Sequence, residues 1–127
     1  MEPSEFFAGP PLGLAVYERV RSIVEGFGPV DVRVSKSQVA FRRRRGFAYL
    51  WLPGMYLANP AAEVVLSIAL RRRIESPRWK EIARPAPTTW MHHLEIHDVA
   101  ELDDEVAGWL GEAAEGAGSS ASGQSSA

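Results

Sequence analysis

The chain has 127 residues, a formal net charge of −2 and no cysteine. This length suits one domain with a real core, and the lack of cysteine excludes both a disulfide framework and a thiolate metal site. The N-terminus lacks the basic start and apolar run of a signal peptide, and no apolar run approaches the ~20 residues of a membrane span. We therefore expect a cytoplasmic protein.

Charge is unevenly distributed along the chain. Residues 33–84 carry twelve basic and three acidic side chains, a net charge of +9, whereas residues 85–127 carry eight acids and no Lys or Arg. One interpretation is that the basic middle pairs with the acidic end and is otherwise solvated. The other is a basic face that meets an anionic partner. The sequence leaves both open.

The first elements are an arm, a helix and a strand. Residues 1–11 contain three prolines and little periodicity, which predicts a flexible N-terminal arm. An apolar stripe at helical spacing predicts a helix over 12–27, ended by the glycines and proline that follow. Alternating valines then predict a strand over 30–36 with one covered face.

The stretch from Val39 to Leu52 predicts a β-hairpin with a cationic tip. Strands over 39–42 and 47–52 flank four consecutive arginines and Gly46, and we expect Gly46 to adopt a positive φ. The second strand is apolar on both faces, so we expect it to be buried on both sides or to lie near the sheet centre. A strand over 64–70 follows, with a set of small side chains that suits a close helix.

The rest of the chain predicts an irregular stretch over 74–89 with a short helical turn at 79–82, a strand over 90–97 and a helix from Leu102. Asp103 suits the N-cap of that helix. The Gly/Ser/Ala composition of 116–127 predicts a disordered tail. Residues 12–115 thus predict a single α+β domain, a two-layer sandwich in which an antiparallel sheet of four to five strands carries the N- and C-terminal helices on one face.

Two basic motifs suggest anion binding, and each has a structural alternative. The arginines 42–45 can contact phosphate bidentately, with Tyr49 and Trp51 near by to stack on bases. They can equally form a solvated hairpin tip that resists edge aggregation. Arg78 and Lys80 bracket Trp79 in a proline-limited loop. That loop predicts either an anion pocket with an aromatic wall, or a packed Trp79 with salt bridges to the acidic last helix.

All three histidines lie in the strand over 90–97. His92 shares a face with Leu94 and Ile96, whereas His93 shares the other face with Glu95 and His97. Metal binding by the second set is disfavoured, because residues i and i+4 of a strand lie ~13 Å apart. A pair formed by His93 and Glu95 would need a ligand from another segment. We expect His92 to be buried and hydrogen-bonded, and we expect no metal and no cofactor.

Catalytic signatures are missing. Ser67 and Ser76 stand in no recognisable nucleophile motif, and the chain has no glycine-rich phosphate loop and no HExxH pattern. We therefore assign no catalytic residue and lean away from an enzyme.

Several segments in order resemble an uncharacterised bacterial family, the domain of unknown function numbered fifty-six fifty-five, in its short actinobacterial form. They are FRRRRGFAYLW, LSIAL, SPRWKE, WMHHLEIHD and AELDDEVAGWL. The resemblance covers about 12–115 and implies an α+β domain with terminal helices. Relatives fused behind nuclease-like or other small domains imply an accessory binding role, with no known activity. The matching motif positions are Arg44, Phe47, Ser76, Arg78, His92 and His93.

Three hypotheses follow. The first is a small binding module for nucleic acid or another phosphate-rich anion, such as a phosphorylated small molecule. It requires the basic side chains to share one patch away from the last helix. The second is a small-molecule or catalytic pocket around Arg78, Lys80, Trp90, His92 and His93. The third is a protein–protein module, such as a homodimer through a sheet edge. The candidate ligand-binding residues are Arg42, Arg43, Arg44, Arg45, Arg71, Arg73, Arg78, Trp79, Lys80, His92 and His93.

Overall fold

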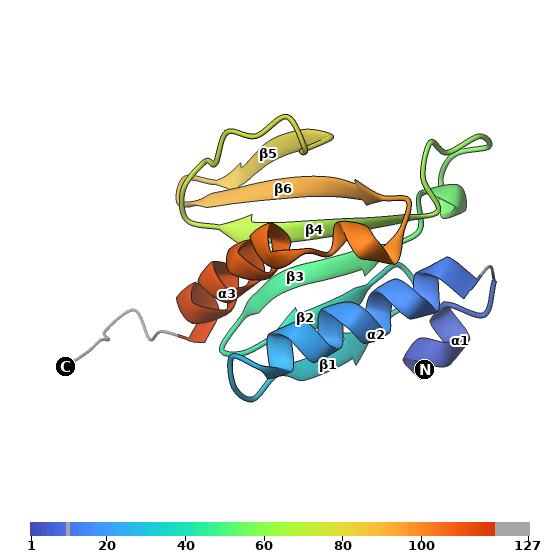
Figure 1. The fold of residues 1–127 in the computed structure, drawn as a ribbon, viewed down its shortest axis with the longest axis horizontal. Helices are drawn as coiled ribbons and strands as arrows, with labels where there is room; N and C mark the ends of the chain where they lie inside the picture. Colours follow the sequence, from blue (N-terminus) through green and yellow to red (C-terminus); the bar gives the residue numbers. More distant parts are fainter. Residues whose placement is uncertain (10, 119–127) are drawn as a thin grey trace.

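The protein is an α+β sandwich in which two long helices cover one face of an antiparallel sheet (Figure 1). The computed structural model describes residues 1–9 and 11–118. The sheet has six strands in the order β1-β2-β3-β4-β6-β5, which is one or two more than expected. The elements in chain order are α1 Pro3–Phe6, α2 Pro11–Glu25, β1 Asp31–Val34, β2 Val39–Arg42, β3 Gly46–Trp51, a 3₁₀ turn at Pro53–Met55, β4 Val64–Leu70, β5 Glu81–Ala86, β6 Thr89–Ile96, a second 3₁₀ turn at Val99–Glu101, and α3 Asp104–Gly118.

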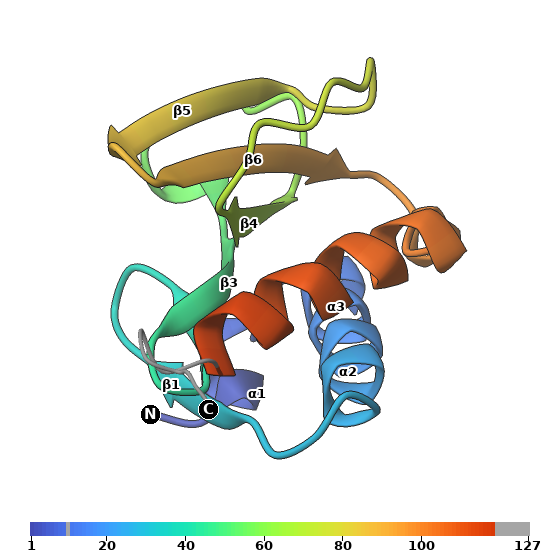
Figure 2. The ribbon, with the colours of Figure 1, turned by 90° about the vertical axis from the view of Figure 1, so that its left-hand side faces the viewer.

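The core lies between the helices and the sheet. Figure 2 shows α2 and α3 on the same side of the sheet, and no long helix of the described residues lies on the opposite face. Period-2 alternation along the strands and a helical stripe on each helix direct large apolar side chains into this layer. Its fully buried members include Val16, Val20, Phe41, Leu50, Leu66, Ile68, Ile96, Val106 and Leu110.

The side chains on the uncovered face of the two central strands differ from the prediction in their burial and in what lies against them. β3 lies near the sheet centre as predicted, with Ala48 and Leu50 buried in the core, but Tyr49 and Trp51 on its other face stay partly exposed. On β4 the large residues, such as Leu66, face the core, whereas Ser67 belongs to the opposite face. The expectation that a helix lies on the small side chains of β4 is therefore wrong.

The strand β5 was not expected from the sequence. Its partner is β6, with Glu81 opposite His93 and a register irregularity between Ala83 and Ala86. The predicted helical turn at 79–82 is absent, and Pro77 and Arg78 form a turn that leads into β5. β5 is an edge strand, where a proline such as Pro85 is tolerated because one side of the strand needs no ladder partner.

The two ends of the chain also differ from the predicted boundaries. Residues expected as a flexible arm form α1, and Phe7 is only 3% exposed, packed at 5.9 Å from the ring of Tyr17. A Cβ on Gly13 would lie 2.8 Å from the Phe7 ring, so a glycine lets the arm approach α2. At the other end α3 continues to Gly118, and the remainder of the predicted tail lies outside the described residues.

Glycine fits position 46 of the hairpin for a different reason than predicted. Among the described residues, Gly28 is the glycine with a positive φ, at 126°, so the expectation for Gly46 is wrong. The hydroxyl of Tyr49 instead occupies the space that a Cβ on Gly46 would need. The register also shifts beside Arg42, and Phe47 is the extra, buried residue of a β-bulge.

Candidate ligand-binding site

The arginine tip of the β2–β3 hairpin caps the end of α3. The Arg43 guanidinium donates to the carbonyl of Ala114 at 3.1 Å, and that of Arg45 donates to Gly116 at 2.9 Å. The backbone N–H of Arg44 donates to the carbonyl of Ala117 at 3.0 Å. These contacts satisfy carbonyls that a helix end leaves without partners and place positive charge at the negative end of the helix dipole.

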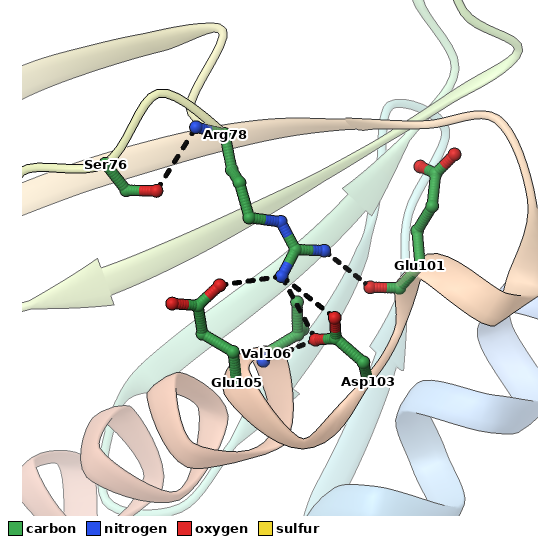
Figure 3. A network of polar contacts seen from close by, with 6 residues as sticks. All are labelled: Ser76, Arg78, Glu101, Asp103, Glu105 and Val106. Atoms are coloured by element: carbon green, nitrogen blue, oxygen red, sulfur yellow. Dashed lines mark hydrogen bonds and ion pairs between the residues drawn. The ribbon is translucent and has the colours of Figure 1, made fainter.

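Arg78 is bound to the other end of α3 (Figure 3). Its Nη1 atom donates to Glu105 at 2.8 Å and to Asp103 at 3.1 Å, and its Nη2 atom donates to the carbonyl of Glu101 at 2.8 Å. The guanidinium also lies 5.7 Å from the ring centre of Trp109. The predicted salt bridge to the last helix therefore forms for Arg78. Few N–H groups of its guanidinium remain to bind an outside anion.

The neighbours of Arg78 do not form an anion pocket either. Trp79 is buried, donates through Nε1 to the carbonyl of Ile74 at 2.9 Å, and packs against Trp109 with ring centres 4.2 Å apart. Lys80 contacts His93 through its backbone N–H, at 2.8 Å from the His93 carbonyl oxygen. No ion pair between Lys80 and an acid occurs within the described residues.

The second arginine cluster is also largely paired. Arg72 forms a bidentate pair with Glu112 on α3 at 2.9 and 3.0 Å, and Arg73 pairs with Glu75. Arg73 also lies over the ring of Trp90, 5.9 Å from its centre. In the part of the chain that the structure describes, Arg42, Arg44 and Arg71 make no hydrogen bond or ion pair through their side chains. The arginine side chains thus divide between the two ends of α3. Arg78 lies at its start, whereas Arg43, Arg45 and Arg72 contact its last turns, so the candidate arginines do not all share one patch.

His92 is sealed in the core, as the sequence predicted. It is 0% exposed, its Nε2 atom accepts from the backbone N–H of Ile74 at 3.1 Å, and its Nδ1 atom lies 3.0 Å from the carbonyl oxygen of Trp90. This arrangement makes Nδ1 the donor. Burial lowers the pKa of His92, because a charged imidazolium would lose its hydration there.

His93 lies on the opposite face, where no helix covers the sheet. Its Nδ1 atom is 2.6 Å from the hydroxyl oxygen of Ser67 on β4, and that same oxygen accepts from the indole Nε1 of Trp51 on β3 at 2.9 Å. Burial lowers the pKa of His93, with a smaller opposing effect from Glu81. Three adjacent strands thus place an indole, a hydroxyl and an imidazole in one hydrogen-bonded row, because β3, β4 and β6 are neighbours in the sheet.

A hollow of about 460 Å³ lies over this row. Its rim includes Tyr56, which is 62% exposed and meets Trp51 edge-on at 6.4 Å between ring centres. Its wall comes from the β1–β2 turn, from β3, β4 and β6, and from the loop after β3. The lining residues are Ser37, Gln38, Tyr49, Trp51, Tyr56, Ser67, Met91 and His93.

Sequence reasoning missed most of this hollow, although signals for it were present. Of the eleven candidate residues, His93 alone lines it. Two signals are present in the sequence: the alternating aromatic pair Tyr49 and Trp51, and the single hydroxyl of Ser67 inside an otherwise apolar strand. Their convergence depends on the pairing of β4 with β6, in which Ser67 lies opposite His93.

The predicted pocket around Arg78, His92 and His93 does not form. Arg78 binds the start of α3, His92 is in the core, and His93 is on the uncovered face. Adjacent residues of a strand point to opposite faces, so His92 and His93 cannot serve one site. Over residues 1–9 and 11–118 no three His, Asp or Glu side chains cluster as metal ligands, and no described helix is long and apolar enough to cross a bilayer.

The fold and the hollow define a two-layer α+β domain in which the long helices of residues 11–118 cover one sheet face. The chain belongs to the family described as domain of unknown function DUF5655, whose model matches residues 4–115. Searches of curated proteins and of solved structures found no match.

Proposed function

We propose that this domain is a small-molecule-binding module whose site is the hollow on the uncovered sheet face. The observation that carries the proposal is the row of Trp51, Ser67 and His93 beneath a concave surface with two further aromatic side chains. Small-molecule sites are concave and mostly apolar, with a few placed polar groups. This hollow has that composition.

The uncovered face supports the proposal because its aromatic side chains lie outside the core between the helices and the sheet. Tyr49 and Trp51 project away from the core, and Tyr56 exposes most of its surface at the rim. Exposed aromatic side chains gathered in a hollow and flanked by polar groups are typical of a binding site.

Binding is better supported than catalysis at this site. Ser67 is only 3% exposed, and its oxygen already faces both Trp51 and His93. A nucleophile has to reach the reacting atom of its substrate, and this hydroxyl is covered. Ser67 is therefore suited to hold the orientation of His93, whose ring lines the hollow.

The test is a heteronuclear NMR titration of the whole chain with a panel of uncharged aromatic fragments. We expect fragments to shift the amide signals of the eight lining residues. Trp51→Ala should abolish those shifts. Trp90→Ala is the matched control, because Trp90 contacts Arg73 and Arg84 outside the hollow. Shifts confined to other surfaces, or no shifts with any fragment, would rule out the hollow as a ligand site.

Binding of nucleic acid or another phosphate-rich anion is a second proposal, supported by Arg42, Arg44 and Arg71. These are the three candidate arginines without side-chain partners in the described residues, and Arg71 lines a cleft of about 570 Å³ with Arg45 and two threonines. That cleft also contains Glu112 and Glu115 and lies at the end of α3, where a helix repels anions. This is the reason why we place it second.

A salt titration tests the second proposal. Affinity for random RNA or DNA should fall steeply with salt if several phosphates are neutralised. Replacing Arg42, Arg44 and Arg71 with Gln should reduce both the affinity and its salt dependence. The same replacement of Arg19, Arg21 and Arg33 changes the net charge equally and should have the smaller effect. Equal losses in the two variants would contradict a site at the first three.

A further inference from the structure

We propose that the hollow selects an uncharged flat aromatic ring with a hydrogen-bond acceptor at its edge, which receives the Nε2–H of His93. This inference rests on the proposed function and names the chemical class of ligand. It is carried by the direction of the hydrogen bonds beneath the hollow, by the charge of its lining and by the orientation of its rings.

The direction of the hydrogen bonds starts at Trp51. An indole Nε1–H can only donate, so Ser67 accepts from it at 2.9 Å. The Ser67 hydroxyl then has its own hydrogen to give, and the Nδ1 atom of His93 lies 2.6 Å away. With Nδ1 as acceptor, the proton of the neutral imidazole resides on Nε2.

The Nε2–H of His93 is left for a ligand. Within the described residues, the His93 ring makes no hydrogen bond other than the one to Ser67. The ring lines the hollow, so its remaining polar atom is a donor with no protein acceptor. A ligand that enters the hollow without an acceptor would leave this donor unsatisfied, which costs binding free energy.

The lining carries no charged side chain. Its eight residues are aromatic, hydroxyl-bearing, amide, thioether or imidazole groups, and burial lowers the pKa of His93, which keeps it neutral at pH 7. An anion would be desolvated here without a counter-ion. It would also meet the negative charge of Glu81, which lies opposite His93 in the ladder, and of Glu95, which shares the same face of β6. A cation would place its charge beside the His93 N–H donor and give that donor no acceptor.

The two rings that contact Trp51 do not stack on it. Tyr56 and His93 are inclined to the indole plane by 60° and 86°, with centres at 6.4 and 6.2 Å. In the described part of the chain no other ring lies parallel to that of Trp51. Flat rings stack on an available aromatic face with favourable dispersion and electrostatics, which favours a planar ring over a flexible chain.

The experiment compares quinoline with naphthalene. The two probes have nearly the same shape and are neutral at pH 7.5, but quinoline carries one ring nitrogen that accepts a hydrogen bond. In an NMR titration we expect quinoline to bind wild-type protein about threefold to tenfold tighter, the usual net effect of one hydrogen bond. His93→Phe keeps a ring in place and removes the donor, so it should abolish the preference and leave the two probes with equal affinities.

A direct measurement keeps the proposal testable if a variant does not fold. Long-range ¹H–¹⁵N spectra of the wild-type imidazoles report which nitrogen carries the proton, and we expect Nε2–H for His93 and Nδ1–H for the buried His92. In Ser67→Ala the His93 proton is no longer held on Nε2, so the preference for quinoline should shrink. An Nδ1–H tautomer of His93 would overturn the inference.

The outcomes separate the two proposals. If both probes bind in the hollow with equal affinity and His93→Phe has no effect on either, the inference is wrong and the small-molecule site stands. If neither probe shifts the lining residues, and no fragment of the wider panel does, the proposed function itself is wrong.

Discussion

Arg78 and Asp103 meet at the N-terminus of α3, where one carboxylate serves two partners. The Asp103 oxygens accept from the Arg78 guanidinium at 3.1 Å, and one of them also accepts from the backbone N–H of Val106 at 3.1 Å. The hydrogen bond from Val106 is the largest single cause of the lowered pKa of Asp103, and the hydrogen bond from Arg78 is the next cause that lowers it. The loop before β5 is thus joined to the last helix through a capping residue.

Removal of this cap should destabilise the fold. We expect Asp103→Ala to lower the free energy of unfolding by about 1–2 kcal/mol, the usual effect of a lost N-cap. Asp103→Asn keeps an acceptor for Val106 and should cost less. Urea denaturation measures both, and Asp104→Asn is the matched control because Asp104 lies one residue further along in the first turn. Equal effects at positions 103 and 104 would contradict the capping role.

Stability should fall on mild acidification because β6 holds a fully buried His92 and a half-buried His93, both in the neutral form. Burial lowers the pKa of His92 and of His93 in the folded protein, whereas an unfolded histidine titrates near about 6.5. Between that value and the lower pKa of the folded protein, the unfolded chain binds more protons than the folded one. The free energy of unfolding therefore decreases as pH falls through this window, and these two histidines do not change it above the window. Urea unfolding at pH 7.5, 6.5 and 5.5 measures the slope.

Replacement of His93 tests the origin of this pH dependence, because its half-buried ring lies 2.6 Å from the Ser67 hydroxyl. His93→Gln should reduce the slope between pH 6.5 and 5.5. Stability that rises on acidification in this range would disprove the assignment of neutral buried histidines.

We expect substitutions at two neighbouring arginines of the hairpin tip to differ in their effect on stability. Arg43 reaches a helix carbonyl from a partly buried position, and such charge-assisted bonds contribute about 1.5–3 kcal/mol. Arg43→Ala should therefore destabilise the protein and speed hydrogen exchange in the last turns of α3. Arg44→Ala removes an exposed side chain while its backbone bond to Ala117 remains, and it should be nearly neutral. Similar losses for the two would argue against capping by the Arg43 side chain.

Gly46 should resist substitution because of Tyr49. A Cβ on Gly46 would meet the hydroxyl and the ring of Tyr49, so Gly46→Ala should destabilise by about 1–3 kcal/mol through overpacking. Adding Tyr49→Phe removes the hydroxyl and should restore part of the loss in a double-mutant cycle of thermal unfolding. Additive effects of the two substitutions would show that the steric contact is not the cause.

Local patterns were enough for most elements of this fold. The strand over 64–70 was predicted with its observed bounds, and the alternation over 90–97 placed His92 in the core and His93 on the other face. Asp103 was recognised as an N-cap from its position alone. These features depend on periodicity and on neighbours a few residues away, which the sequence displays directly.

The order of residues along this chain determined an α+β sandwich, its antiparallel strands and the sealed position of His92, because side-chain period and burial are local properties. Only the tertiary structure decided the role of the arginines and the position of the hollow. The acceptors of Arg43 and Arg45 lie 71 residues further along the chain, and Trp51, Ser67 and His93 meet only through strand pairing. Contacts of that range follow from how the whole chain packs, and no short pattern of residue types encodes them.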